Sequence, residues 1–424
     1  MLTIRPHARL TFLVVAATLL ASTLAQADVV TDWSITAGDL AATGKLPSGG
    51  AYRATAVVQT AVYEAVNAIT KRYPPERVKL DAAPGASTEA AVAAANRSTL
   101  TALVPVQQAA IDKAYQEALA TLPDTPAKTA GIAVGEQAAT ALLALCANDG
   151  FDAPDSYRPY TTPGAYVPTT LPDIAHWPGR KPWTLTRADQ FRPGPPPSLT
   201  SAVWARDYNE IKALGAKQST QRTAEQTVIA RFWEARVPTI YLPVVRSVAM
   251  APGREITQNA RLLAVATQAM DDALIAVADA KYHYNFWRPI TAIRNGDSDG
   301  NDATERDASW VPLIDTPMHP EYPCAHCILS ATVATVLYAE VGPGSMPTLR
   351  TTSPTAPGME RSWTTIEEFM QEVANARIYD GVHYRNSTEV GTAMGKQVGA
   401  WAAGKYLQGP QASPSPTRVS PPAK

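Results

Sequence analysis

The stretch that decides the fold is residues 319–341, HPEYPCAHCILSATVATVLYAEV. Its second part, residues 328–340, is an apolar run typical of a buried helix. Pro320 and Pro323 restrict the chain that enters this helix, so the first free N–H groups fall beside His326. A helix start binds anions, and a histidine there can donate or accept a proton near neutral pH. The stretch therefore predicts an oxyanion site, with a histidine that only caps or packs on the helix as the simpler alternative.

The pattern outside this stretch is helical and alanine-rich, and strand-like alternation is scarce. We therefore expect an all-α fold. Residues 152–197 contain eleven prolines and scattered aromatic residues, which predicts a long excursion without regular structure packed over the helices. The expected helices cover residues 52–69, 87–122, 125–148, 201–214, 223–233, 256–280, 328–340, 363–376 and 388–407.

The chain has 424 residues, of which 46% are hydrophobic and 18% charged, enough for a large core in one or two domains. Its net charge is −1 and it has no basic tract. Nucleic acid and anionic membrane surfaces are therefore not expected partners, and small-molecule chemistry is the default.

The first 27 residues resemble a cleavable export signal. Arg5 and Arg9 precede an apolar run that ends in Ala25-Gln26-Ala27. We expect cleavage before Asp28 and a periplasmic or secreted protein. An uncleaved membrane anchor is the alternative, although the run is short for a span, and no later segment is expected to cross a membrane. The Pro/Ser-rich tail, residues 409–424, is expected to be disordered.

Three cysteines, an odd number, allow at most one internal disulfide and exclude a disulfide scaffold. Cys324 and Cys327 form a C-x-x-C motif that could mark a zinc or redox site. A zinc site needs further ligands, and a thioredoxin-like site needs a βαβ context that the helical pattern does not offer. We expect instead that the pair packs beside the helix start, or that one of them bonds to Cys146.

Two further clusters carry cations and a histidine. In residues 281–294, KYHYNFWRPITAIR, Lys281 and Arg288 are seven apart and would share one face of a helix that Pro289 then disrupts. In ARIYDGVHYR, Arg377 and His383 are six apart, and a helix break at the intervening glycine would let them meet. The simpler alternatives are a solvated basic face and an unrelated surface arginine and core histidine.

Taken in order, the clusters read Lys-x6-Arg-Pro, Pro-x-x-His and Arg-x5-His. This order resembles the vanadium-dependent haloperoxidase and type-2 phosphatidic-acid phosphatase superfamily, and the words FWRP, HPEYP, GVHYR and TAVYEAVNAI resemble its haloperoxidase branch. The resemblance implies helical bundles in one domain over residues 28–408. We divide it into N-terminal helices (28–150), the proline-rich excursion (151–200) and a site-bearing part (201–408).

The resemblance also implies roles for single residues. Lys281, Arg288 and Arg377 would neutralise a tetrahedral oxyanion, His383 would bind its central atom, and His326 would be the acid–base group. In a haloperoxidase the anion is the cofactor vanadate, which activates hydrogen peroxide for attack by halide. In a phosphatase it is the substrate phosphoryl group, which the ligand histidine attacks.

The sequence departs from the superfamily pattern Pro-Ser-Gly-His, because Cys324 and Ala325 replace Ser-Gly in the oxyanion-binding segment. We expect a weaker S–H donor in place of a hydroxyl. His319 stands where bromoperoxidases often carry histidine, which favours bromide or iodide. The hypotheses are a haloperoxidase with peroxide, halide and an organic acceptor as partners, a phosphatase acting on phosphate esters, and a silent anion-binding relative.

Overall fold

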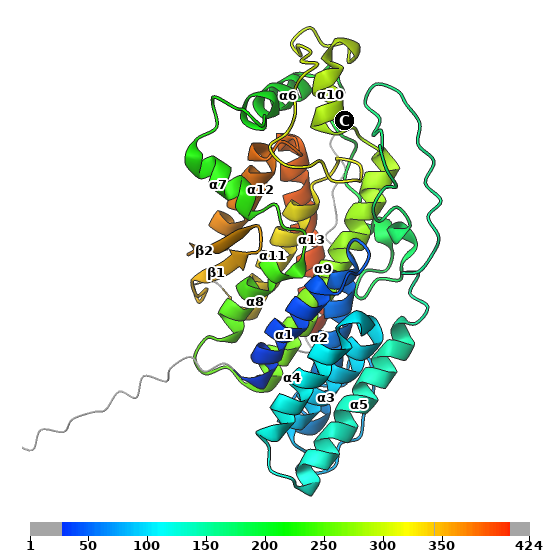
Figure 1. Ribbon diagram of the computed structural model, residues 1–424, viewed down its shortest axis with the longest axis vertical. Coiled ribbons are helices and arrows are strands. Elements are labelled where there is room, and N and C mark those ends of the chain that lie inside the picture. The colour runs from blue at the N-terminus through cyan, green and yellow to red at the C-terminus, as the bar shows by residue number, and fades with distance from the viewer. Residues whose placement is uncertain (1–27, 343, 408–424) are drawn as a thin grey trace, which may run out of the picture.

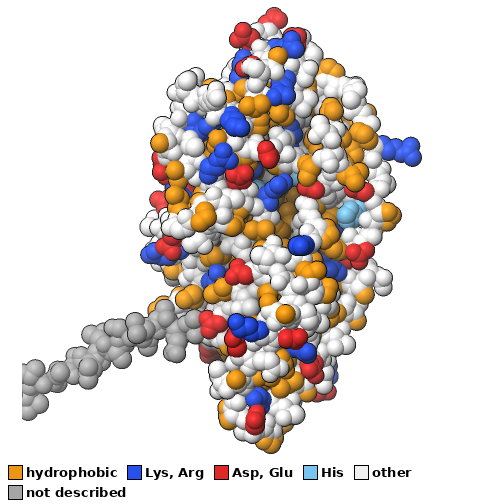
Figure 2. Space-filling model, viewed as in Figure 1, with side chains coloured by type: hydrophobic (Ala, Val, Ile, Leu, Met, Phe, Trp, Pro, Cys, Tyr) orange, Lys and Arg blue, Asp and Glu red, His pale blue; other side chains and the backbone are white. Residues whose placement is uncertain are grey.

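The structure is a computed structural model that describes residues 28–342 and 344–407. The predicted export signal, residues 1–27, and the predicted disordered tail, residues 409–424, lie outside the described residues. On the face shown in Figure 2, acidic and basic side chains are interspersed with apolar ones, as the near-zero net charge suggests.

Thirteen α-helices and one antiparallel hairpin form the regular structure of the described part of the chain, joined in places by short 3₁₀ turns (Figure 1). The all-α prediction is therefore confirmed. The elements are α1 (Val29–Thr43), α2 (Gly50–Thr70), α3 (Thr88–Leu103), α4 (Gln108–Ala120), α5 (Pro126–Cys146), α6 (Ala202–Leu214), α7 (Ala224–Phe232), α8 (Leu242–Ala249), α9 (Ile256–Tyr284), α10 (Pro289–Arg294), α11 (Ala325–Val341), β1 (Leu349–Ser353), β2 (Ala356–Trp363), α12 (Ile366–Tyr379) and α13 (Arg385–Tyr406).

Helix α9 is the central element of the fold. Its 29 residues span about 44 Å, and nearly every position from Thr257 to Lys281 is buried. A helix that is covered on all sides belongs to the core of a large domain. Figure 1 shows α9 between the N-terminal helices and the pair α11 and α13, and it contacts both groups. The last turn of α9 thereby reaches the buried centre of the molecule.

The proline-rich excursion packs along α9, as predicted. Arg180 donates to Asp271 on α9 at 2.8 Å, and both side chains are buried. The next residue, Asp272, accepts hydrogen bonds from the backbone N–H groups of residues 183–185. Carboxylates that accept several N–H groups compensate for their own burial and for that of the segment they hold. The excursion is thus fixed against the same helix that carries Lys281.

Some elements differ from the prediction. Residues 87–122 form two helices, α3 and α4, because Pro105 begins a separate 3₁₀ turn between them. Three helices (α1, α8 and α10) and the β1–β2 hairpin were not predicted. Helices α8 and α10 have only 8 and 6 residues, too few turns for a helical period to be recognised in the sequence.

Helix α5 differs from the expectation that no segment after the N-terminus could cross a membrane. By length and composition it is the one described helix that could cross a membrane, whereas no such segment was expected after the N-terminus. Of its most apolar window, 39% is buried, and the helix packs along α3 and α2. We interpret α5 as a helix of the bundle because that packing uses one of its faces.

Helices α11 and α13 lie in very close contact. Gly391, Gly395 and Gly399 occur every fourth residue of α13 and face the backbone of α11. A Cβ atom on Gly395 would stand 2.3 Å from the carbonyl oxygen of Ile328, so a larger residue would force the helices apart. This contact fixes the start of α11 beside the start of α13.

Candidate oxyanion site

The first cluster lies where α9 ends. Lys281 is in the last turn, the helix stops at Tyr284, and Asn285 adopts a left-handed conformation with φ 48°. Arg288 is the residue before α10, and Pro289 is the first residue of that helix. The two cations therefore do not share one helix, and the proline begins a helix instead of disrupting one, because its fixed φ suits a first position. Both points correct the sequence prediction.

The third cluster forms at the junction of α12 and α13, as predicted. Arg377 is in the last turn of α12, and Gly381 has φ +87°. The chain then turns back, so that the backbone N–H of His383 donates to the carbonyl oxygen of Arg377 at 3.0 Å. The break in the helix brings the two side chains to one place.

The start of α11 supplies free backbone donors. Cys324 is the N-cap, and its sulfur accepts the backbone N–H of Cys327 at 3.1 Å. The N–H groups of Ala325 and His326 have no acceptor within the described residues. Two free N–H groups at the positive end of a 17-residue helix favour an anion.

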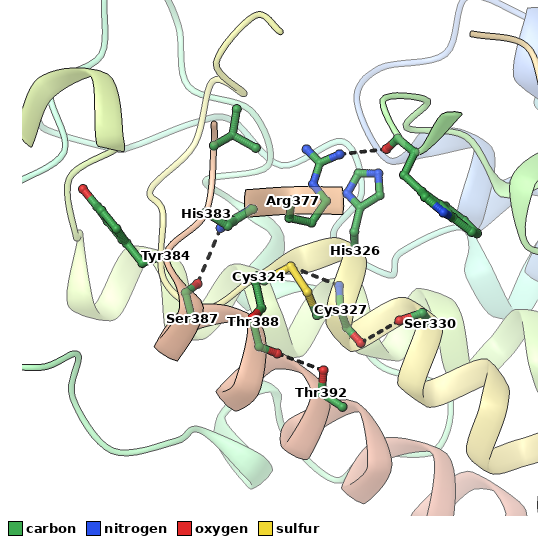
Figure 3. Close-up of a disulfide and its surroundings, with 12 residues drawn as sticks. Cys324, His326, Cys327, Ser330, Arg377, His383, Tyr384, Ser387, Thr388 and Thr392 are labelled. Carbon is green, nitrogen blue, oxygen red and sulfur yellow. Dashed lines mark hydrogen bonds between the residues drawn. A yellow bond between two sulfur atoms is a disulfide. The ribbon is translucent and has the colours of Figure 1, made fainter. Parts of the chain in front are cut away.

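Most predicted site residues meet at one cavity. Figure 3 shows the side chains of His326, Arg377 and His383 close together above the start of α11. Arg288 lines a neighbouring cavity, and Lys281 lies buried behind, where its ammonium donates to the carbonyl oxygens of Pro320 and Glu321. The residues of the predicted set that line the first cavity are Ala325, His326, Arg377 and His383.

Arg288 connects the two cavities. Its Nη2 is 2.9 Å from Nδ1 of His319, and its Nε donates to the carbonyl oxygen of the same histidine at 2.8 Å. Its Nη1 lies 3.4 Å from Nε2 of His383 and donates to the carbonyl oxygen of Val382. His319 also lines the first cavity, so it belongs to the wall of the site.

Two carboxylates complete the site, and neither was predicted from the sequence. Oε1 of Glu321 lies 2.7 Å from Nδ1 of His383 and accepts the backbone N–H of Tyr384 at 3.1 Å. Oδ2 of Asp380 lies 2.9 Å from Nη1 of Arg377. Both stand inside quoted stretches, Glu321 in HPEYP and Asp380 in ARIYDGVHYR. They could have been found from the counter-charge that buried cations require.

Burial shifts the pKa values of the carboxyl groups and of the histidine at this site. It raises the pKa of Glu321 to about 7 and that of Asp380 to about 6, against the opposing effect of nearby cations. Burial, and then Arg288 and Lys281, hold the pKa of His383 well below its usual value. His383 is therefore neutral at neutral pH, with its Nδ1 proton directed to Glu321 and a lone pair on Nε2.

His326 is held in a similar way by the backbone. Its Nε2 donates to the carbonyl oxygen of Ala235 at 3.0 Å. Burial, followed by the charge of Arg377, keeps the pKa of His326 well below its usual value. The neutral ring thus has its Nδ1 free to accept a proton.

The cysteines differ from the expectation. Cys324 and Cys327 are joined by a disulfide, and Cys146 is a buried free thiol (Figure 3). Cys324 therefore has no S–H to donate to an anion, and its backbone N–H is used by the carbonyl oxygen of Ser387. Of the pair that replaces Ser-Gly, only Ala325 lines the cavity. Changing Cys324 to serine would add a hydroxyl but also break the disulfide.

The arrangement can bind a tetrahedral oxyanion. Among the described residues Arg377 lines the cavity, with Arg288 and Lys281 buried behind its wall, and Nε of Arg377 is a buried donor without a partner. Such a donor is costly unless a ligand satisfies it. The neutral Nε2 of His383 supplies one lone pair to the same place. An anion of the size and charge of phosphate or vanadate fits this set of donors.

Comparisons with known proteins agree with this geometry. The model of the VCPO second helical-bundle domain matches residues 261–409. A vanadium chloroperoxidase of Curvularia inaequalis is 26% identical over 181 residues, which make up 35% of this chain and 29% of that protein. The chain thus matches less than a third of the length of that relative.

Solved structures share most of the fold. The first bacterial vanadium-dependent iodoperoxidase structure has a TM-score of 0.75 at 23% identity, covering 90% of this chain and 97% of that one. A holo-type bacterial vanadium-dependent chloroperoxidase has a TM-score of 0.68 at 16% identity, covering 91% and 94%. The helical fold of vanadium haloperoxidases and the resemblance to their superfamily are confirmed.

Changing Gly381 to alanine should displace His383. The residue has φ +87°, and a Cβ atom would lie 2.4 Å from the carbonyl oxygen of Gly215. We expect Gly381→Ala to lower the free energy of unfolding by at least about 1–2 kcal/mol in chemical denaturation. Gly404→Ala is the control, because nothing lies within 4 Å of that position on α13. The control should be neutral or slightly stabilising; equal effects of both changes would contradict this account.

Anion affinity should fall as the pH rises. Asp380 and Glu321 lose their protons near pH 6 and 7 and then repel an anion, whereas the histidines stay neutral throughout. Sulfate keeps its charge between about pH 5 and pH 8. Calorimetric titration should show its affinity falling about tenfold over that range, and Asp380→Asn should flatten the change. An affinity that rises with pH would contradict the assignment of these carboxyl groups.

Proposed function

We propose that this chain is a vanadate-dependent haloperoxidase that oxidises halide with hydrogen peroxide. The observation that carries the proposal is the pair formed by Glu321 and His383. With Nδ1 donating to the carboxylate at 2.7 Å, the opposite nitrogen, Nε2, has only a long contact of 3.4 Å from Arg288 and is the nitrogen that could bind a ligand. A carboxylate behind a histidine is the usual support of a metal ligand.

The residues that would hold vanadate are those around the cavity. Lys281, Arg288 and Arg377 would neutralise its charge, the N–H groups of Ala325 and His326 would donate to its oxygens, and His383 would be its protein ligand. When bound, vanadate supplies a Lewis-acid centre that activates hydrogen peroxide toward halide.

His326 would move the protons. Its Nε2 is engaged by the carbonyl oxygen of Ala235, so the ring is held in one tautomer with Nδ1 available. A neutral imidazole can take a proton from hydrogen peroxide as it binds and return a proton to the product. General acid–base catalysis of this kind contributes typically about a hundred- to ten-thousandfold in rate.

Bromide or iodide is the halide that we favour. His319 lines the cavity and contacts Arg288, at the position where bromoperoxidases of the superfamily often carry histidine. The similar solved structures include an iodoperoxidase and chloroperoxidases, so the fold alone does not select a halide. The partners would be hydrogen peroxide, halide and an organic acceptor.

A phosphatase is the second candidate, and the same pair of residues favours it. A histidine whose Nδ1 donates to a carboxylate is also an activated nucleophile, so Nε2 of His383 could attack phosphorus in a bound phosphate ester. The third candidate is a silent anion-binding relative. It is supported by the disulfide of Cys324, which leaves no hydroxyl or thiol donor at that position.

Export to the periplasm or the medium remains our proposal for the location of the protein. A disulfide between Cys324 and Cys327 suits an oxidising compartment, which supports it. The export signal read from residues 1–27 is consistent with the same location.

Vanadium content and turnover test the proposal together. Protein equilibrated with orthovanadate should retain about one vanadium per chain, and His383→Ala should lose it because its ligand nitrogen is gone. His283→Ala, which changes an exposed histidine in the last turn of α9, is the matched control and should retain it. Vanadium retained equally by both variants would point to a different ligand.

Two assays then separate the candidates. A haloperoxidase should brominate a phenolic dye only with peroxide and vanadate, and His326→Ala should lose about a hundredfold or more of that turnover. A phosphatase should instead hydrolyse an aryl phosphate and be inhibited by vanadate. Binding of vanadate without turnover in either assay would favour the silent relative and reject our proposal.

A further inference from the structure

Three further segments line the cavity that contains the oxyanion residues, and we call this part, which includes the exposed Arg236, the mouth. Tyr52 comes from the start of α2, Asp173 and Ile174 come from the proline-rich excursion, and Arg236 comes from the connection between α7 and α8. None of these residues belongs to the predicted oxyanion set. The mouth is therefore a separate part of the cavity, with its own chemistry.

Arg236 is the charged group at this mouth that lacks a partner. Its side chain is exposed, and no hydrogen bond or ion pair to it is formed within residues 28–342 and 344–407. The oxyanion cations differ, because Arg377 has Asp380 beside it and Lys281 donates to two carbonyl oxygens. Arg236 is thus free to pair with a ligand that enters the cavity.

The charge of Arg236 reaches the other groups of the cavity. It lowers the pKa of His319, of His326 and of Asp173, although burial is the larger influence on each. Burial raises the pKa of Asp173, against a hydrogen bond from Ser48 and the charge of Arg236. Asp173 forms no ion pair within the described residues, and its carboxyl group can accept a further hydrogen bond beside the one from Ser48. The mouth therefore offers one cation and one acceptor.

The walls between Arg236 and the oxyanion residues are largely apolar. Ile174, Leu274 and Leu329 are almost fully buried and line the cavity together with Pro317. The phenol of Tyr52 is 4% exposed. An organic molecule with a flat apolar body can cover these surfaces, whereas a halide ion or peroxide gains nothing from them.

Ile174 is held in an unfavourable conformation at this wall. Its φ is +55°, in the left-handed region that a β-branched residue rarely adopts. Its carbonyl oxygen accepts the N–H of Trp177 at 3.1 Å, and the N–H of Asp173 donates to the carbonyl oxygen of Met318 at 2.6 Å. Residues kept in such conformations cluster at ligand sites, where the surrounding structure holds them.

We propose that the mouth is a binding site for the organic acceptor, and that the acceptor is a small aromatic acid. Its carboxylate would pair with Arg236, its ring would lie against Ile174, Leu274 and Leu329, and a hydroxyl on the ring could donate to Asp173. The proposal rests on the proposed function for what happens to the bound molecule, but the binding itself does not require vanadate or peroxide.

The test compares a charged and an uncharged probe of the same shape. Calorimetric titration of the wild-type protein with 4-hydroxybenzoate and with 4-hydroxybenzamide, without vanadate or peroxide, should show tighter binding of the acid. Arg236→Gln should weaken binding of the acid about five- to tenfold and leave the amide within about twofold. Lys217→Gln, which removes an exposed cation from the neighbouring cavity, is the control and should change neither.

A second variant separates the mouth from the oxyanion site. If the carboxylate occupied the oxyanion residues instead, Arg377→Gln would abolish the preference for the acid and Arg236→Gln would not, and the proposal would be overturned. It would equally be overturned if the wild type bound neither probe, or if Arg236→Gln weakened both probes alike. If the protein prefers the acid over the amide through Arg236 but does not brominate, the binding site is supported and only the proposed function is rejected.

Discussion

Three cations buried in one place impose the constraint on which the rest of this structure depends. Lys281, Arg288 and Arg377 are each at most 1% exposed. Removing a cation from water costs several kcal/mol unless partners compensate for it. Glu321 and Asp380 provide part of that compensation, yet burial raises the pKa of both toward neutrality, so part of their charge is lost. A bound oxyanion would supply what remains.

The fold meets this constraint by bringing the ends of several helices together. The site is built from three helix ends: the carboxyl end of α9, the junction of α12 and α13, and the start of α11. Helix ends carry unpaired N–H or carbonyl groups, which suits them to hold charges. The lysine at the end of α9 is held by two carbonyl oxygens, and Gly381 allows the turn that returns His383 to Arg377. The close contact of Gly391, Gly395 and Gly399 on α13 with α11 holds the starts of these two helices side by side.

Much of the fold and the cationic part of the site could be predicted from the sequence, because long amphipathic helices and widely spaced histidine and arginine motifs leave strong patterns. The two carboxylates could not be found by pattern, since a single Glu321 between prolines has the appearance of a surface residue until its burial is known. The disulfide between Cys324 and Cys327 could be recognised only once the structure showed which cysteines lie close together. Arg236 is not part of any sequence motif, and its possible role became visible only from the cavity that it lines.

The central claim is that these cations and His383 surround one anion at the start of α11. The most direct measurement is a crystal of the protein soaked in orthovanadate, with anomalous diffraction data used to locate vanadium. We predict one strong peak per chain, in contact with Nε2 of His383 and within reach of the guanidinium of Arg377. No peak in the cavity, or a peak only beside Arg236 at the mouth, would contradict the account.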